Sequence, residues 1–328
     1  MTGWVKFFWR VVLIVGVMSG MILSPMPARA AKPASPEGLL QVMSAEEKIG
    51  QLFLVTFQGS EITEESQIAD LIANYHIGGV VLLAENDNFA SSETIANTRA
   101  MIQALQQLEW SSSTGGLPVE TLQNEEYAAY VPLLVGLKQI GNGFPGDQIL
   151  SGLTQLPSQM AIGATWDLGL AEQVGAVLGS ELNTLGVNLL LGPNLDVLET
   201  TNIEAASSLG VNTYGGDPFW VGEMGKAFIG GLHTGSQNRL MVVAQNFPGT
   251  GNSDRSPESE IATVRKSLEQ LKQIELAPYF SVTTPDFGDP GRVDGLMVSH
   301  IRYQGFQGNI RATTRPISFD SNAFQQIL

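Results

Sequence analysis

The chain has 328 residues, 43 % of them apolar and only 15 % charged, so it can bury a large core and general disorder is excluded. Its 17 Lys and Arg residues against 32 Asp and Glu residues give a net charge of −15, which makes nucleic acid an unfavourable partner. The absence of Cys excludes disulfides, thiolate nucleophiles and cysteine-ligated zinc, and three His leave little room for a histidine-built metal site. We expect no metal and no cofactor.

The first 30 residues have the layout of a secretory signal peptide. Lys6 and Arg10 form a basic start, an apolar run covers 11–23, and Ala28-Arg29-Ala30 is a small-x-small cleavage site. The apolar run is too short for a permanent membrane-spanning helix, which needs about 20 residues. We therefore predict a cleaved signal at 1–30 and an exported chain, periplasmic or extracellular, with an uncleaved N-terminal anchor as the alternative.

From residue 31 onward, helical and strand-like segments alternate. Ser44 and Glu47 form a capping box that predicts a helix start. Apolar runs typical of strands lie at 52–57, 78–83, 132–137, 187–191, 239–244 and 296–301. Helical patterns lie at 92–108, 168–185 (ending at Gly186), 218–234 and 257–276, and the polar residues 109–131 are predicted to form a surface insertion.

Near-continuous apolar strands separated by helices indicate a parallel sheet covered on both faces. This α/β pattern fits a (β/α) barrel or an open doubly wound sheet, and periodicity alone does not choose between them. Residues 141–146 match the dinucleotide fingerprint G-x-G-x-x-G. However, Pro145 removes an amide, no helix opens at Gly146, and no strand-end acid follows about 20 residues later. We interpret that match as coincidental.

Seven segments, read in order, resemble motifs of glycoside hydrolase family 3. They are 77–82 (IGGVVL), 132–139 (PLLVGLKQ), 156–165 (LPSQMAIGAT), 186–197 (GVNLLLGPNLDV), 214–218 (YGGDP), 246–251 (NFPGTG) and 298–301 (VSHI). The likeness runs colinearly from about Ser44 to Leu328 and is greatest to the β-N-acetylhexosaminidase branch. It implies a single domain over 31–328 with the family's TIM-type (β/α) barrel.

The resemblance also implies retaining glycoside hydrolysis, with an Asp nucleophile and a proton donor about 5–5.5 Å apart. In the hexosaminidase branch the donor is a His, and the sugar is held by an Asp, two Arg and a Lys-His pair. The sugar-holding Asp falls on Lys138, and the two Arg fall on Gly143 and Asn212. The Lys-His pair becomes Gln245-Asn246.

Further along, the His of the family's "GHG" motif becomes Thr250, and the nucleophile's strand end is expected beyond Leu328. The family framework is thus kept while its polar machinery is replaced. As candidate sugar-binding residues we select Lys138, Asp196, Asn212, Gln245, Asn246 and His300.

These candidates carry different expectations. Asp196 has the alternative role of a turn former in the loop after its strand. His300 sits at the carboxyl end of a strand, where barrel active sites lie. Gln245 and Asn246 can hydrogen-bond sugar hydroxyls but do not change protonation near neutral pH. His76 and His233 are interpreted as connector and helix-end residues.

Glu258 falls on the position of the family's catalytic His. If Asp254 is instead aligned with the Asp that is paired with this His in the family, the His position falls on Ser256. A carboxylic acid can donate a proton if burial raises its pKa. However, Ser256-Pro257-Glu258 has the pattern of the first positions of a helix, where the helix dipole favours a carboxylate. We therefore prefer helix-end stabilisation for Glu258 and keep proton donation as the alternative.

Only about 27 residues follow Ile301, and closing a barrel needs strand-plus-crossover units of about 30 residues each. We predict a barrel that is incomplete at its C-terminal end. Three functions stay open for this chain, expected to be a monomer with a glycan or amino-sugar ligand. It is a hydrolase of exported glycans such as peptidoglycan fragments, a non-catalytic relative that binds glycan or protein, or a truncated product without its nucleophile. As given, it is predicted to be inactive or weakly active.

Overall fold

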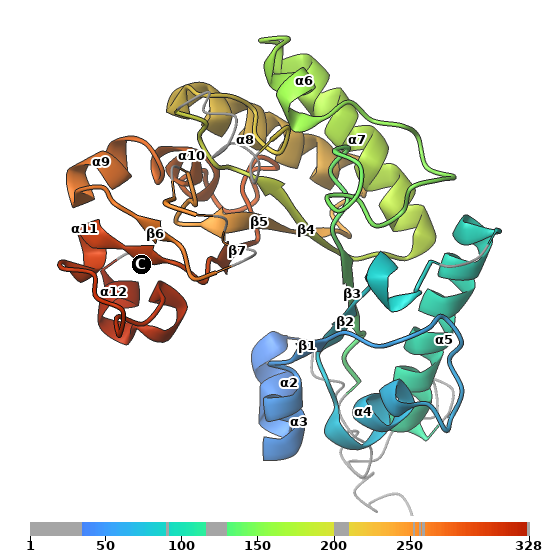
Figure 1. Cartoon of the computed structure of the whole chain (residues 1–328). Helices are drawn as coiled ribbons and strands as arrows, with labels where there is room; N and C mark the ends of the chain where they lie inside the picture. Colours follow the sequence, from blue (N-terminus) through green and yellow to red (C-terminus); the bar gives the residue numbers. More distant parts are fainter. Residues whose placement is uncertain are drawn as a thin grey trace, which may run out of the picture.

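A curled parallel sheet forms the core of the molecule (Figure 1). The computed structural model describes residues 35–89, 92–115, 130–199, 210–251, 253–255, 257 and 260–326. Its strands are β1 (Leu54–Val55), β2 (Gly79–Val81), β3 (Leu134–Leu137), β4 (Leu189–Asn194), β5 (Met241–Phe247), β6 (Thr263–Val264), β7 (Gly295–Val298) and β8 (Arg302–Tyr303). Among these residues the main sheet has the order β1-β2-β3-β4-β5-β7, all parallel, and β6 pairs with β8 separately.

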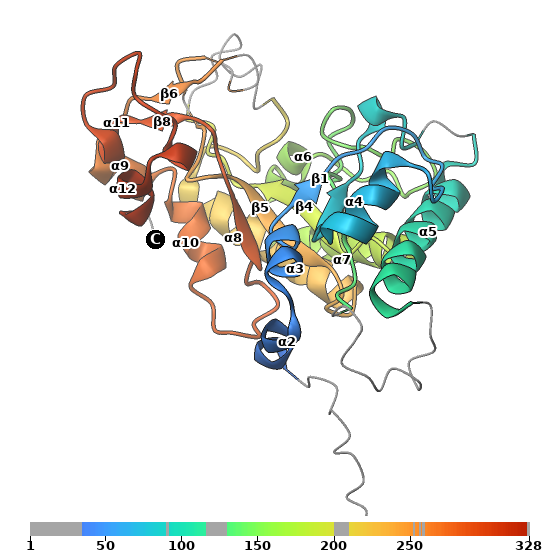
Figure 2. The same ribbon diagram turned by 90° about the horizontal axis from the view of Figure 1, so that it is seen from below.

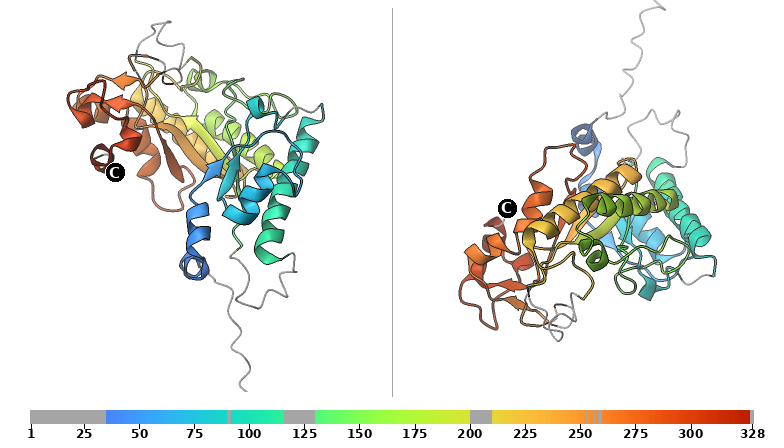
Figure 3. Two further views of the ribbon diagram at one scale, coloured as in Figure 1. Left: turned by 60° about the horizontal axis from the view of Figure 1, so that its bottom comes forward. Right: turned by 90° about the horizontal axis from the view of Figure 1, so that it is seen from above.

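Helices connect the strands and cover the outer, convex face of the sheet (Figures 2 and 3). They are α2 (Pro36–Val42), α3 (Ala45–Gly50), α4 (Gln67–Tyr75), α5 (Thr94–Thr114), α6 (Gln159–Gly163), α7 (Leu168–Leu185), α8 (Pro218–Gly235), α9 (Leu268–Gln273), α10 (Ala277–Thr283), α11 (Gln304–Gln307) and α12 (Ser321–Gln325), with short 3₁₀ turns at Ala84–Asn86 and Ile317–Phe319. Within the described ranges, no helix is long and apolar enough to cross a membrane.

The two faces of the sheet differ in burial. Side chains on the convex face, such as Val135 and Val242, are completely buried against the helices. On the concave face, the side chains of Leu54, Met241 and Met297 remain 44 %, 41 % and 42 % exposed. The expectation of a sheet covered on both faces is therefore wrong for the concave face, because the curled sheet leaves it open between the edge strands β1 and β7.

Sequential strand order with the helices on one side is the arrangement of a (β/α) barrel rather than of a doubly wound sheet. The predicted α/β fold, an incomplete TIM-type barrel, is confirmed. The capping box is also present, since Ser44 N–H donates to Glu47 Oε2 (2.6 Å) and Glu47 N–H donates to Ser44 Oγ (3.1 Å). The helix predicted at 168–185 has those bounds, and Gly186 ends it at a φ of 92°.

Helix α5 runs six residues past its predicted end, to Thr114. The reason is local: the hydroxyls of Ser112 and Thr114 donate to the carbonyls of Leu108 and Trp110 one turn earlier, so these polar residues are satisfied within the helix. The surface insertion predicted at 109–131 stays a prediction, because 116–129 lie outside the described residues. The same holds for the signal peptide at 1–30.

The single helix predicted at 257–276 is wrong. Thr263 and Val264, both β-branched, form the strand β6 instead, and the next helix begins at Leu268. Ser267 and Gln270 form the capping box that starts α9, since each side chain accepts from the other's backbone N–H. The S-x-x-Q pattern of residues 267–270 is the local sequence signal for this helix start. Glu258 itself lies outside the described residues.

His233, in the last turn of α8, connects this helix to the segment before β7. Its Nδ1 lies 2.7 Å from the carbonyl of Pro290 and its Nε2 lies 2.9 Å from Oδ2 of Asp294. Both partners are acceptors, so this placement favours the imidazolium form, with a proton on each ring nitrogen. Burial alone would lower the pKa of His233, but the bonds to Asp294 and Pro290 outweigh it and raise the pKa. The helix-end role predicted for His233 agrees with this placement.

Replacing His233 by Gln should lower the free energy of unfolding at pH 6 by about 1–2 kcal/mol, because a partly exposed ionic hydrogen bond is lost. With a raised pKa, the stabilisation from His233 is full below the unfolded value of about 6.5 and is lost as pH rises through the folded pKa. Urea denaturation between pH 5.5 and 8.5 measures this. Exposed His300→Gln is the control, and a wild-type pH slope in His233→Gln would contradict the prediction.

Candidate functional site

The carboxyl ends of β4 and β5 bring together a buried carboxylate and residues 245–251, which are the end of β5 and the turn after it (the loop 245–251). Asp196, 1 % exposed, lies two residues after β4. Its Oδ1 accepts from Thr250 N–H (2.5 Å) and Gly251 N–H (3.4 Å). Its Oδ2 accepts from Thr250 Oγ1 (2.6 Å) and Asn246 Nδ2 (2.7 Å). Both carboxylate oxygens of Asp196 accept hydrogen bonds from the loop, so Asp196 holds Asn246 and Thr250 in position.

Two buried tyrosines hold the same loop from the other side. Tyr279 of α10 donates its hydroxyl to the carbonyl of Gln245 (2.7 Å), and Tyr303 of β8 donates to the carbonyl of Gly249 (2.8 Å). Burial raises the pKa of both phenols, and the charge of Asp196 raises it further. They therefore stay protonated and serve as fixed donors. Asn246 completes the loop in the left-handed region at a φ of 67°, which Asn tolerates better than most residues.

A lysine with two carboxylates lies behind the loop. Lys266 forms ion pairs with Glu199 and with Glu275, whose side chain is inaccessible. Gly249 and Gly251 pack directly on Glu275, since a Cβ at Gly249 would lie 2.8 Å from the Cβ of Glu275. Burial raises the pKa of Glu275, and the ion pair with Lys266 opposes that rise. The loop is thus clamped between two buried carboxyl groups, Asp196 and Glu275.

A second polar network connects the loop after β3 to the end of β4. Asn142 Nδ2 donates to Oδ1 of Asn212 (2.5 Å), and Asn142 Oδ1 accepts from the backbone N–H of Gln159 (2.9 Å). Gln159 Nε2 then donates to the carbonyl of Asn194 (2.9 Å). This network of amides, half-buried at Asn142 and Asn212, offers donors and acceptors at the carboxyl ends of β3 and β4.

The glycine-rich segment 141–146 has a structural explanation. Buried Asp147 accepts from the backbone N–H groups of Ile140 (2.6 Å), Gly141 (2.9 Å) and Gly143 (2.7 Å). The segment is therefore wrapped around a carboxylate of its own chain and is followed by no helix. It is not a dinucleotide fingerprint.

The predicted site residues separate into groups. Asp196, Asn246 and Gln245 lie together, with Gln245 Nε2 donating to the carbonyl of Leu191 (2.9 Å), and Asn212 belongs to the second network. Lys138 follows β3 and is half-buried. Within the described residues, His300 is exposed and hydrogen-bonds only to Ser318 Oγ (2.8 Å), with its ring edge-on to Phe319. Sugar contact by these residues stays a prediction.

Several residues of the site were not predicted. Gln159 and Asn142 are ordinary amides 17 residues apart with no periodic signal, and Lys266 lies in the segment wrongly predicted as helix. Tyr279 lies just beyond that segment, in α10, where no helix is predicted from the sequence. Across the described ranges, no group of three or more His, Asp or Glu residues is arranged to hold a metal ion.

Comparison with known proteins agrees with this geometry. The model of the glycosyl hydrolase family 3 N-terminal domain matches residues 44–328. The chain belongs to glycosyl hydrolase family 3. Among relatives of this family member, a beta-hexosaminidase of Nitrosomonas eutropha is 26 % identical over 286 residues, 85 % of this chain and 68 % of the relative. A beta-hexosaminidase A of Pseudoalteromonas piscicida is 25 % identical over 241 residues, 72 % of this chain and 35 % of the relative.

Solved structures give the same family. A glycoside hydrolase family 3 beta-N-acetylglucosaminidase from Paenibacillus superposes with a TM-score of 0.70 at 26 % identity, covering 86 % of this chain and 46 % of that one. A beta-N-acetylhexosaminidase from Beutenbergia cavernae shares the fold with a TM-score of 0.66 at 21 % identity, covering 87 % of this chain and 74 % of that one. The family 3 chain thus spans only part of each relative's length.

Proposed function

We propose that this family 3 chain is an exported, hexosaminidase-type protein that binds amino-sugar glycans at the carboxyl ends of β3, β4 and β5 with little or no hydrolysis. Export is supported by the signal-peptide layout of residues 1–30, and the glycan class by the hexosaminidase relatives. Peptidoglycan fragments are the exported ligands that we propose.

The loop 245–251 carries the proposal. Where the family resemblance expects a Lys-His pair and a further His, the loop has Gln245, Asn246 and Thr250. Amides and hydroxyls hydrogen-bond sugar hydroxyl and acetamido groups. None of the three titrates near neutral pH, so the loop has no general acid for the glycosidic oxygen. Binding is supported by this arrangement more strongly than turnover.

Binding is tested by calorimetry with N,N′-diacetylchitobiose. Replacing half-buried Asn212 by Ala should weaken binding about fivefold, the effect of losing one neutral hydrogen bond. Asn74→Ala, which removes an exposed amide on α4, is the matched control and should change nothing. Chitobiose binding that is equal in wild type and Asn212→Ala would contradict the proposed site.

Turnover is tested with a fluorogenic N-acetylglucosaminide. We expect no saturable hydrolysis, because general acid catalysis supplies typically about 10²–10⁴-fold and the loop provides none. Glu258→Gln separates the remaining alternative. Robust turnover that disappears in this variant would identify Glu258 as proton donor and would replace the binding proposal by a hydrolase.

A further inference from the structure

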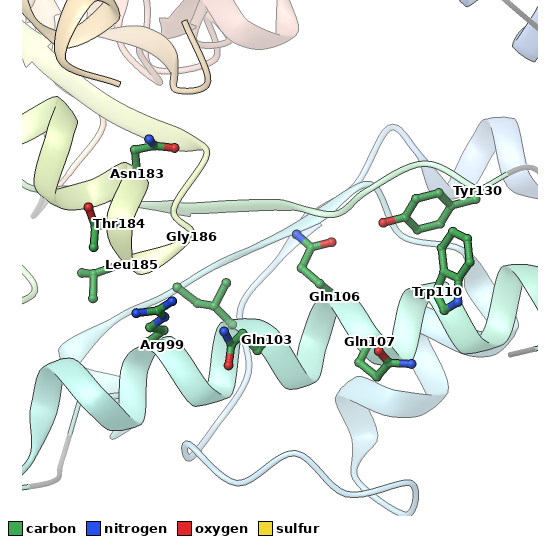
Figure 4. Close-up of a pocket in the computed structure, with 11 residues that line it drawn as sticks. Arg99, Gln103, Gln106, Gln107, Trp110, Tyr130, Asn183, Thr184, Leu185 and Gly186 are labelled. Atoms are coloured by element: carbon green, nitrogen blue, oxygen red, sulfur yellow. The ribbon is translucent and has the colours of Figure 1, made fainter. Parts of the chain in front are cut away.

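A groove of about 620 Å³ lies outside the sheet, between α5 and the C-terminal end of α7 (Figure 4). Two of its lining residues mark its position along the strands. Tyr130 precedes β3 and Gly186 precedes β4, so the groove lies at the amino ends of these strands. Asp196 and the loop 245–251 lie at the carboxyl ends of β4 and β5, at the other end of the sheet. The groove is therefore separate from the site described above.

One face of α5 supplies most of the lining. Arg99, Gln103, Gln106 and Trp110 recur at intervals of four, three and four residues and therefore share one side of the helix. They extend over about 16 Å of helix length. Gln106 is the floor, since its side chain accepts from Leu133 N–H (3.1 Å) and donates to the Leu133 carbonyl (2.8 Å).

Two other polar groups of the groove bond within their own helices, Gln107 to Ser111 and Thr184 to the carbonyl of Ser180. Arg99, Gln103 and Asn183 are available to a ligand. Within the described part of the chain, Arg99 is exposed and pairs with no carboxylate, and the lining itself contains no Asp or Glu. Gln103 and Asn183 likewise form no side-chain hydrogen bond among these residues. In a chain of net charge −15, an exposed Arg free of acidic neighbours in its groove is suited to one ligand carboxylate.

The far end of the groove is an aromatic pair. The rings of Trp110 and Tyr130 meet edge to face, with centroids 4.8 Å apart. In Figure 4 the Tyr130 hydroxyl points along the groove toward Gln106. Burial raises the pKa of Tyr130, and the charge of Glu109 raises it further, so the hydroxyl stays a donor. Tyr and Trp each combine an apolar ring with one hydrogen-bond donor, so this pair offers a ligand both a packing surface and polar contacts.

We propose that this groove is a second glycan-binding site, which takes an oligosaccharide carrying one carboxylate. Arg99 binds the carboxylate, Gln103 and Asn183 bind hydroxyl or acetamido groups, and a sugar ring packs against Trp110 and Tyr130. The choice of a glycan rests on the proposed function. A peptide fits less well, because most of the lining side chains are polar and suit the hydroxyl groups of a glycan better than apolar peptide side chains.

The test is calorimetry on the full chain with two probes. The acidic probe is the disaccharide of N-acetylglucosamine and N-acetylmuramic acid, and the neutral probe is N,N′-diacetylchitobiose. Arg99→Met should weaken groove binding of the acidic probe about fivefold and leave the neutral probe unchanged. Gln103→Glu, which places a carboxylate one helical turn from Arg99, should weaken binding of the acidic probe more than binding of the neutral probe.

Trp110→Ala should weaken both probes about tenfold at the groove and reduce the stoichiometry from two to one. Trp220→Ala, an aromatic truncation on α8 outside the groove, is its control. Unchanged binding in Arg99→Met, Gln103→Glu and Trp110→Ala would overturn the inference, as would equal losses of both probes in Arg99→Met. Asn212→Ala affects only the site at the carboxyl ends. If the groove variants bind the probes more weakly while Asn212→Ala binds them normally, the proposed function is rejected and the groove is retained.

Discussion

Replacing Asp196 by Ala should lower the free energy of unfolding by about 4 kcal/mol, because several buried donors lose their acceptor together. The backbone N–H and hydroxyl of Thr250 and the amide of Asn246 all donate to this carboxylate. Neither Ala nor the buried surroundings can replace these acceptors. Urea denaturation of the purified chain measures the change.

Asp196→Asn is the matched control. Burial is the main cause that raises the pKa of Asp196, and a neutral amide avoids that penalty. The remaining oxygen can accept from the Thr250 and Gly251 backbone, while the Thr250 hydroxyl rotates to act as acceptor. The Asn246 amide, which donates to Oδ2 in the wild type, turns over so that its oxygen accepts from the new amide group. We expect a loss of about 1 kcal/mol. An Ala variant as stable as the Asn variant would mean that the carboxylate does not hold the loop.

The location of the site could be predicted from the sequence, but the roles of its residues could not. The family resemblance selects both Asp196 and Asn246 as candidate sugar-binding residues, and the structure places their side chains in contact. The hydrogen bond from Thr250 to the Asp196 carboxylate depends on the path of the loop, including the left-handed conformation of Asn246. No local pattern encodes such a path.

The groove between α5 and α7 could not be located from the sequence at all. On α5, Arg99, Gln103 and Gln107 have the spacing of an ordinary solvated helix face. Only the approach of the C-terminal end of α7, with Asn183 and Leu185, encloses that face. Strand and helix periods thus determine which surfaces are buried, whereas tertiary packing decides which polar surfaces form a site.

Helices α7 and α8 are in closer contact than side chains with a Cβ would allow. A Cβ at Gly231 of α8 would lie 2.0 Å from the carbonyl oxygen of Glu172, and one at Gly179 of α7 would lie 2.3 Å from the carbonyl oxygen of Leu232. Both clashes are with backbone, which cannot move aside as a side chain can. The two helices lie side by side over the sheet, so separating them also disturbs the core beneath (Figure 3).

Gly231→Ala should therefore lower the free energy of unfolding by about 3 kcal/mol, because the extra methyl must push the helices apart. The neighbouring Gly230 is the control: a Cβ there would meet its nearest atom, Gly291 N, at 3.7 Å, an ordinary contact. Gly230→Ala should instead stabilise by about 0.5–1 kcal/mol, because Ala favours helix over Gly. Thermal and urea unfolding of the two variants should thus change in opposite directions. Equal stability of the two would show that α7 and α8 do not approach this closely in solution.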